Sequence, residues 1–366
     1  MTGQIDGSIL TPGGWVSGRL AHGNHIDSVS GVATNTPEPP YILPGFVDCH
    51  VHGGGGADMM EGAEAIRTAA RLHARHGTTS FCPTSVTAPT GDLDTFLDAV
   101  ADVMADPPTD GARILGAHLE GPFVNPDKLG AQPPFARQAD AAQLRDWTAR
   151  ATVRIMTFAP EMDADDALLD ALEAAGIRAQ LGHSLCDYAR ARAVLDRGAG
   201  VTHLFNAMSG IAHRGNGLCG AAFAHATYAE IIPDLIHVEA GAIRAARRAI
   251  PNLYGVTDAT AGAGMPDGTY RLGSLEVCKS DGAMRLPDGT LAGSALTMDQ
   301  ALRNLVEIGL PLDEAARRLS TLPADWLGLR DIGRLAPGAH ADILVLDDML
   351  TLTRVIAGGH DILTPR

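Results

Sequence analysis

The stretch "PGFVDCHVHGGGG", residues 44–56, places two histidines two positions apart at the end of an apolar run and follows them with four glycines. Residues two apart in a β-strand point to the same side, so His50 and His52 can converge on one point. Two convergent imidazoles suit a metal ion, although strand-end histidines also serve in ordinary hydrogen bonding. The glycines permit backbone conformations closed to other residues, as expected where a chain turns sharply beside a ligand.

One pattern, an expected strand followed by an expected helix, repeats from about residue 42 to about residue 260. A short apolar or β-branched run is followed by polar or glycine-rich residues and then by an Ala/Leu/Arg-rich segment with helical spacing. The runs that predict strands are 41–52, 77–86, 112–120, 153–161, 177–184, 200–208, 229–238 and 253–260. Eight such units predict an α/β fold, a (β/α)8 TIM barrel. A doubly wound open sheet is the competing architecture, but no GxGxxG follows the first strand.

The two ends of the chain have a different pattern. Residues 1–41 and 333–366 contain short alternating strands and glycine turns, and we expect them to meet in one small β-sandwich domain outside a barrel of residues 42–332. Residues 297–330 look helical instead, with Thr297 and Gln300 at the spacing of a capping box. These helices are expected to pack against the barrel and return the chain to the β domain.

Bulk properties exclude several classes of function. The 366-residue chain has a formal net charge of −15, which argues against a nucleic-acid-binding surface. It contains no apolar run of membrane-spanning length and no signal-peptide pattern at its start, so we expect no membrane association and a cytoplasmic location. Its five cysteines lack CxxC spacing, which argues against a disulfide framework.

Further candidate ligands lie at the ends of other predicted strands. Each of them alone could be a helix cap or an ordinary hydrogen-bonding group. Because the carboxyl ends of barrel strands meet at one mouth, together with the first histidine pair they offer the nitrogen and oxygen ligands that Zn²⁺ or Fe²⁺ accepts. These residues are Glu120 in "HLEGPF", His183 in "LGHS", His203 in "THLFNAM" and Asp258 in "GVTDAT".

From about residue 42 to the C-terminus, the chain resembles the N-acetylglucosamine-6-phosphate deacetylases of the amidohydrolase superfamily. The resemblance is carried, in order, by "PGFVDCHVHGGGG", "HLEGPF", "LGHS", "THLFNAMS", "HVEAGAIR", "VTDATAGAG" and "LAGSALTMDQALRNLVE". It implies that Glu120, His183 and His203 bind the principal metal. His50 and His52 match a pair that holds a second metal in some members, so one or two divalent ions, Zn or Fe, are expected.

The resemblance also implies a reaction, the hydrolysis of N-acetylglucosamine 6-phosphate to glucosamine 6-phosphate and acetate. Asp258 would act first as general base on a metal-activated water and then as general acid. The implied substrate contacts are Asn206 and Ala207 at the phosphate, Arg214 paired with it, and His237. In this family the arginine can come from the neighbouring subunit, so the resemblance implies a homodimer.

Two departures from the family pattern fall in this region. "KLGAQ" places Gln132 where the family commonly has a histidine that helps to polarise the carbonyl. A glutamine can still donate a hydrogen bond to a developing oxyanion, but it cannot carry a proton. "HRGNG" replaces the more usual "HREPG", which keeps Arg214 but alters its loop.

Three alternatives remain at this point. N-acetylgalactosamine 6-phosphate differs from the glucosamine substrate at one hydroxyl, which no motif reports. A cyclic amidohydrolase or deaminase often has a carboxylated lysine on the fourth strand, and segment 153–161 contains no lysine. A non-catalytic barrel that serves as a binding module should have lost ligands or the acid/base, and this chain keeps both.

Overall fold

A barrel of eight parallel strands forms the centre of the molecule in the computed structural model, which describes residues 3–363. Each strand overlaps one of the eight predicted segments, so the predicted (β/α)8 barrel is confirmed. Their apolar side chains are buried, as expected for parallel strands covered by helices. The strands are β5 (Phe46–Val51), β8 (Thr78–Ser85), β10 (Ala117–Glu120), β11 (Val153–Phe158), β12 (Arg178–Leu181), β13 (Gly200–Val201), β14 (Tyr228–Ile231) and β15 (Asn252–Gly255).

Backbone hydrogen bonds close these strands into a ring. Six of them pair in the order β13-β12-β11-β10-β8-β5, and β14 pairs with β15. The Leu204 N–H donates to the Glu230 carbonyl at 2.9 Å across the gap between β13 and β14. The Asp258 N–H donates to the His50 carbonyl at 2.9 Å beyond β15. The carboxyl ends of all eight strands therefore surround one mouth.

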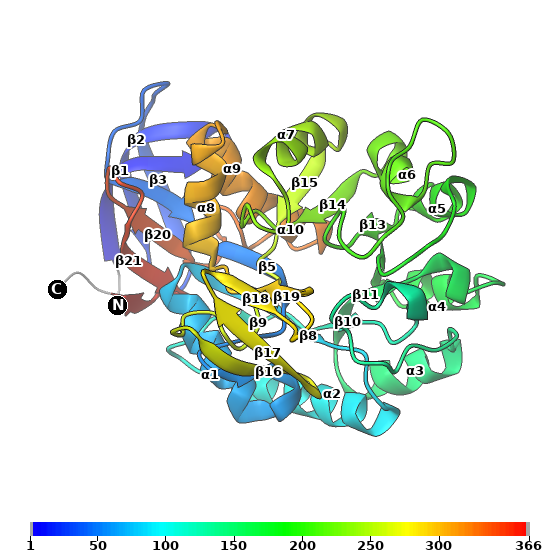
Figure 1. The fold of residues 1–366 in the computed structure, drawn as a ribbon. Helices are drawn as coiled ribbons and strands as arrows, with labels where there is room; N and C mark the ends of the chain where they lie inside the picture. Colours follow the sequence, from blue (N-terminus) through cyan, green and yellow to red (C-terminus); the bar gives the residue numbers. More distant parts are fainter. Residues whose placement is uncertain (1–2, 364–366) are drawn as a thin grey trace.

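Helices follow the strands and surround the ring (Figure 1). In the first of them, Ile66, Ala69, Ala70 and Ala74 are buried at three- and four-residue spacing, so this face packs on the barrel. Gly77, with φ of 86°, then turns the chain into β8. The helices are α1 (Ala63–Arg75), α2 (Thr90–Ala105), α3 (Ala141–Arg150), α4 (Ala167–Ala174), α5 (Tyr188–Leu195), α6 (Leu218–His225) and α7 (Ala240–Ala249). Short elements between them are β6 (Gly53–Gly54), β7 (Ala57–Asp58), β9 (Arg113–Ile114), η1 (Met59–Glu61), η2 (Pro126–Lys128) and η3 (Pro160–Met162).

Both chain ends join one seven-stranded sheet in the order β22-β21-β20-β4-β1-β2-β3. Figure 1 shows its blue and red strands side by side. Ile9, Ile42 and Ile343 belong to a separate apolar cluster on one face of the sheet, whereas Leu43 and Leu344 pack into the barrel core. The strands are β1 (Gly3–Thr11), β2 (Gly14–His22), β3 (Ile26–Ala33), β4 (Tyr41–Pro44), β20 (Ile343–Leu346), β21 (Leu352–Ala357) and β22 (His360–Leu363). The sheet thus includes residues 42–44, beyond the expected boundary at 41.

A four-stranded antiparallel sheet lies between β15 and the C-terminal helices. This sheet was not predicted from the sequence. It consists of β16 (Gly268–Leu272), β17 (Leu275–Ser280), β18 (Ala283–Arg285) and β19 (Leu291–Ser294). Asp281 and Gly282, both with positive φ, form the two-residue turn between β17 and β18. This sheet, yellow in Figure 1 and called the insert sheet below, stands beside the barrel mouth and contributes residues to the cavity described below.

Three helices occupy the region predicted to be helical: α8 (Met298–Glu307), α9 (Leu312–Leu319) and α10 (Thr321–Trp326). The predicted capping box at the start of α8 is wrong. The Thr297 hydroxyl donates to Asp299 Oδ1 at 2.6 Å, and Gln300 donates to Asn304 at 2.7 Å. The hydroxyl thus donates to a carboxylate, and its oxygen accepts from no backbone N–H at the helix N-terminus. Across residues 3–363, none of the helices combines the length and the apolar character needed to cross a bilayer.

Candidate metal centre

Buried histidines and carboxylates gather at the carboxyl ends of the barrel strands. His50 lies on β5 and Glu120 is the last residue of β10, whereas the other ligand candidates lie on the segments that follow their strands. His183, His203 and Asp258 adopt positive φ values of 48°, 26° and 52°. Such backbone conformations are uncommon outside glycine and cluster at functional sites, where the surrounding structure holds them.

Glu120, His183 and His203 form a first trio. The Nε2 atoms of His183 and His203 lie 3.1 and 3.0 Å from Glu120 Oε1. The two Nε2 atoms are 3.1 Å from each other. Three potential ligand atoms, one at the end of β10 and two on the segments after β12 and β13, thus face one point.

The hydrogen bonding of His183 shows that this point suits a cation. Its Nδ1 lies 2.8 Å from the Lys128 carbonyl, which can only accept, so Nδ1 carries the proton. In the metal-binding form of the ring, with Nε2 unprotonated, this atom presents a lone pair to the ring of His203 and to the carboxylate of Glu120. Lone pairs at these separations repel one another unless a cation or a proton lies among them, so the donor set fits a divalent metal.

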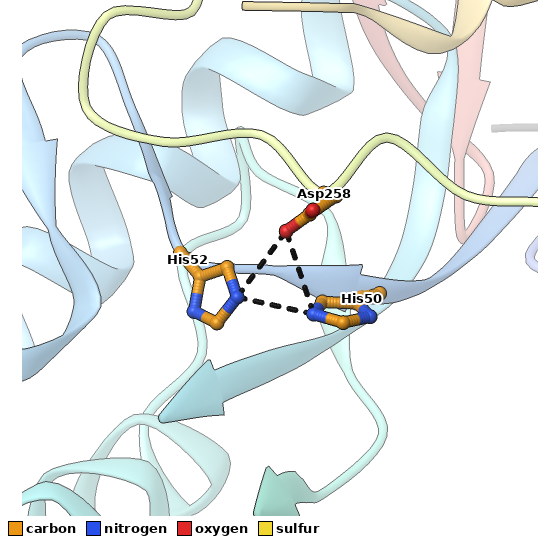
Figure 2. Close-up of side chains that lie close together, drawn as sticks. All are labelled: His50, His52 and Asp258. Atoms are coloured by element: carbon orange, nitrogen blue, oxygen red, sulfur yellow. Dashed lines mark hydrogen bonds and ion pairs between the residues drawn. The ribbon is translucent and has the colours of Figure 1, made fainter. Parts of the chain in front are cut away.

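His50, His52 and Asp258 form a second trio (Figure 2). The Nε2 atoms of the two histidines are 3.0 Å apart. Asp258 Oδ1 lies 3.5 Å from the His50 Nε2 and 3.3 Å from the His52 Nε2. Glu120 faces both trios, because its Oε2 lies 3.2 Å from His52 Nε2 while its Oε1 faces His183 and His203. A carboxylate in this position can bridge two cations.

The glycines after His52 form a tight and ordered turn. A Cβ atom on Gly53 would lie 2.5 Å from the Ala57 carbonyl oxygen, so no larger residue fits there. His73 Nε2, on α1, lies 2.9 Å from the Gly53 carbonyl and holds the turn from outside. The glycine run therefore fixes the position of His52 rather than forming a flexible loop.

The carboxylates of Glu120 and Asp258 are kept ionised by the histidines around them. Burial opposes the charge on Glu120, but the charges of His50 and His183 outweigh it and hold the pKa of the carboxyl well below its ordinary value. Burial likewise opposes the charge on Asp258, but the charge of His50 and the hydrogen bond of His52 lower its pKa. Ionised carboxylates are the form that binds metals and accepts protons.

A cavity of about 320 Å³ opens above the two trios. Three of the four predicted substrate contacts, Asn206, Ala207 and His237, line it together with Gln132. Arg214 is not among the lining residues of the described chain; it is exposed on the segment after β13. The insert sheet and the turn before β19 add Leu272, Arg285, Gly289, Thr290, Leu291 and Gly293 to the wall.

The side chain of Gln132 has a fixed orientation. Its Oε1 accepts a hydrogen bond from the Thr87 N–H at 2.6 Å, which identifies the oxygen end of the amide. The Nε2 therefore faces Glu120 Oε2 and donates to it. Gln132 thus contacts the carboxylate shared by both trios and keeps a second N–H free of that bond.

Two residues of the site were missed by our sequence reading. Glu230, on β14, is fully buried and its Oε2 lies 3.0 Å from His50 Nδ1. A carboxylate within an apolar strand was a signal that could have found it. Arg285 lines the cavity from β18, and no motif marked it because the insert sheet itself was not anticipated.

The amidohydrolase family model matches residues 41–362 of this chain. The chain belongs to the amidohydrolase family. This amidohydrolase is 35% identical over 365 residues to an N-acetylgalactosamine-6-phosphate deacetylase from Escherichia coli O157:H7, covering 96% of each chain. It is 38% identical over 339 residues to the N-acetylglucosamine-6-phosphate deacetylase of Mus musculus, covering 87% of this chain and 82% of the relative.

A solved structure of the same family has nearly the same fold. It is a variant of the N-acetyl-D-glucosamine-6-phosphate deacetylase from Mycobacterium smegmatis in complex with N-acetyl-D-glucosamine-6-phosphate. The TM-score is 0.90 at 33% sequence identity, covering 100% of this chain and 99% of that one. The amidohydrolases are metal-dependent, in agreement with the two trios found here.

Proposed function

We propose that this amidohydrolase removes the acetyl group from N-acetylglucosamine 6-phosphate, giving glucosamine 6-phosphate and acetate. The observation that carries the proposal is the pair of ligand trios joined by Glu120 at the floor of a cavity. The relative of known structure with this sugar phosphate bound supports the choice of substrate.

The metal is proposed to be Zn²⁺ or Fe²⁺, held by Glu120, His183 and His203. A second ion would be held by His50, His52 and Asp258, with Glu120 shared between the two positions. A divalent ion in such a site would lower the pKa of a bound water to about 7 and polarise a carbonyl oxygen.

Asp258 is proposed to move the proton. Its carboxylate is ionised, lines the cavity and belongs to the second trio. It takes a proton from the water whose oxygen bonds to the acetyl carbon, and it returns that proton to the sugar nitrogen as the C–N bond breaks. Acetate and a free amine leave. Gln132, with its amide nitrogen turned toward the site, is proposed to donate a hydrogen bond to the carbonyl oxygen during this step.

The phosphate is proposed to bind at the end of the cavity lined by Asn206, Ala207, His237 and Arg285. His237 Nδ1 lies 2.6 Å from Asp234 Oδ2. Burial opposes protonation of this ring, but the hydrogen bond and charge of Asp234 outweigh it and raise the pKa of His237. An imidazolium and a guanidinium on one wall suit a phosphate group, which binds best through charge-assisted hydrogen bonds.

A substrate panel tests the proposed function and the role of Arg285 together. Acetate release is expected from N-acetylglucosamine 6-phosphate and to be far slower from the unphosphorylated sugar. Arg285→Ala should raise KM for the phosphorylated sugar about 10-fold or more, because a hydrogen bond to a charged group contributes roughly 1.5–3 kcal/mol. It should leave kcat/KM for the unphosphorylated sugar unchanged. Arg271→Ala, an exposed change in the same insert sheet, is the matched control.

Equal hydrolysis of phosphorylated and unphosphorylated sugars would contradict the proposal. An unchanged KM in Arg285→Ala would show that this arginine does not bind the phosphate.

N-acetylgalactosamine 6-phosphate is the second candidate substrate, favoured by the relative from Escherichia coli O157:H7 that covers 96% of this chain. The same panel compares kcat/KM for the two sugar phosphates.

The protein is further proposed to act as a homodimer in which Arg214 reaches the site of the neighbouring subunit. Arg214 lies on an exposed segment outside the cavity of its own chain. Three large apolar side chains, Leu185, Ile211 and Ile236, are exposed on the loops that follow β12, β13 and β14. Exposed apolar side chains around one rim are typical of a surface that a second subunit covers.

Mixing two inactive variants tests this arrangement. If Arg214 acts across the interface, subunits with Arg214→Ala and subunits with Asp258→Asn regain acetate release after exchange, because each mixed dimer contains one intact site. A mixture of Asp258→Asn with Glu120→Ala should stay inactive, since both defects lie within their own chains. No recovery in the first mixture would show that Arg214 does not complete a neighbouring site.

A cytoplasmic location is proposed from the cysteines. All five are free thiols in the described structure, and four of them are buried. Unpaired thiols are typical of proteins in a reducing compartment.

A further inference from the structure

Glu230 is a buried carboxylate that takes no part in the proposed reaction. It lies on β14 between the apolar residues Ala229 and Ile231, and its side chain is fully buried. Among the described residues, no lysine or arginine forms a salt bridge with it. Burying a carboxylate in a barrel core is costly unless hydrogen bonds satisfy it, so its presence there points to a role.

Three donors converge on this carboxylate within 3.2 Å, and the Tyr254 hydroxyl lies 3.3 Å from its Oε1. Its Oε2 accepts from His50 Nδ1 at 3.0 Å and from the backbone N–H of His203 at 3.2 Å. Its Oε1 accepts from Gln180 Nε2 at 2.9 Å. The amide of Gln180 is itself oriented, because its Oε1 accepts from the Tyr254 hydroxyl at 2.7 Å. One oxygen of Glu230 therefore contacts a residue of each trio.

We propose that Glu230 is a positioning residue shared by both metal positions, setting one ligand of each. A carboxylate accepts the Nδ1 proton of His50, so when this ring binds a metal its lone pair is the one on Nε2, which faces the second trio. The bond to the His203 N–H holds the chain where His203 adopts a φ of 26° and turns its ring toward the first trio. Occupancy of the two positions is thereby coupled. The inference rests on the proposed metal-dependent function.

His50, His118 and Glu230 form a third group of possible metal ligands, but this group supports the two trios and is not a further metal site. Both ring nitrogens of His118 have partners: Nδ1 lies 2.9 Å from the Cys49 carbonyl and Nε2 lies 2.8 Å from the Thr157 hydroxyl. With no nitrogen left for a cation, His118 supports the strands and does not extend the metal site.

The test is a zinc titration against a chromogenic chelator, carried out without substrate on wild-type protein and on Glu230→Gln. The neutral amide cannot accept all three donors and weakens the orientation of His50 and His203. Both binding steps should lose about 10- to 100-fold in affinity, the usual effect of removing an outer partner of metal ligands. Glu230→Asp, which keeps the charge, should recover part of the loss.

Two further variants separate positioning from general damage to the core. Tyr254→Phe removes the hydroxyl 3.3 Å from Glu230 Oε1 but leaves the bonds of Glu230 to His50 and to His203 in place, so it should lower the thermal midpoint while zinc affinity stays within a few-fold of wild type. His52→Ala should weaken one binding step only. Wild-type affinity in Glu230→Gln, or the loss of a single step as in His52→Ala, would overturn the inference and leave the proposed function standing. Wild-type protein that binds no zinc would overturn both.

Discussion

Asp258→Asn protein is expected to retain metal at the first trio while acetate release falls by about 10²- to 10⁴-fold, the usual contribution of a positioned acid or base. Asparagine has the same shape and keeps an oxygen beside His52, but it can neither take a proton from water nor return one to the amine. Steady-state acetate release and elemental analysis of the same preparation measure the two quantities.

The matched control is Asp348→Asn, which makes the same change at an exposed carboxylate far along the chain in the turn before β21. It should leave both the rate and the metal content at wild-type values. Wild-type kcat in Asp258→Asn would contradict the assignment of Asp258 as base and acid. Metal absent from the first trio in this variant would instead make Asp258 a structural ligand.

Glu120→Ala is expected to have the second large effect, the loss of both metal positions together with all measurable acetate release. Its two oxygens face different trios, with Oε1 3.1 Å from His183 Nε2 and Oε2 3.2 Å from His52 Nε2. Removing the carboxylate leaves uncharged imidazoles as the only ligands of the first trio, so divalent ions should bind there far more weakly. Metal content after dialysis and the rate of acetate release measure the effect.

The circular dichroism spectrum of Glu120→Ala checks that the variant is folded. This check is needed because removing a buried carboxylate that faces several histidines can destabilise the fold. Glu64→Ala is the control, because Glu64 is exposed on α1 and its pair with Arg67 is a surface salt bridge of small energy. A folded Glu120→Ala protein that keeps two equivalents of metal would show that the trios are not joined through this residue.

The barrel could be predicted from the sequence because short apolar or β-branched runs alternate with segments of helical spacing over residues 42–252. The ligand candidates could be predicted for the same reason, since Glu120, His183, His203 and Asp258 each stand at or just after a strand end. Parallel strands bring such positions to one mouth whatever their separation in the chain. The convergence of the His50 and His52 rings follows from the two-residue period of a strand.

Other features depend on contacts that no local pattern reports. Glu230 falls within a predicted apolar strand, and its contacts with the site arise only where β14 lies beside the segment after β13. Arg285 lines the cavity because the insert sheet stands beside the mouth. The sequence around Thr297 has the spacing of a capping box, but the Thr297 hydroxyl donates to the carboxylate of Asp299 instead. The role of Arg214 depends on a second subunit and stays a prediction.

The central claim is that one divalent ion lies among Glu120, His183 and His203, and anomalous diffraction from crystals of the purified protein tests it most directly. Data collected at the zinc and iron absorption edges should show a peak about 2.0–2.2 Å from Glu120 Oε1 and from the Nε2 atoms of both histidines. Metal-replete crystals with no peak among these three side chains, or with their only peak elsewhere, would contradict the claim.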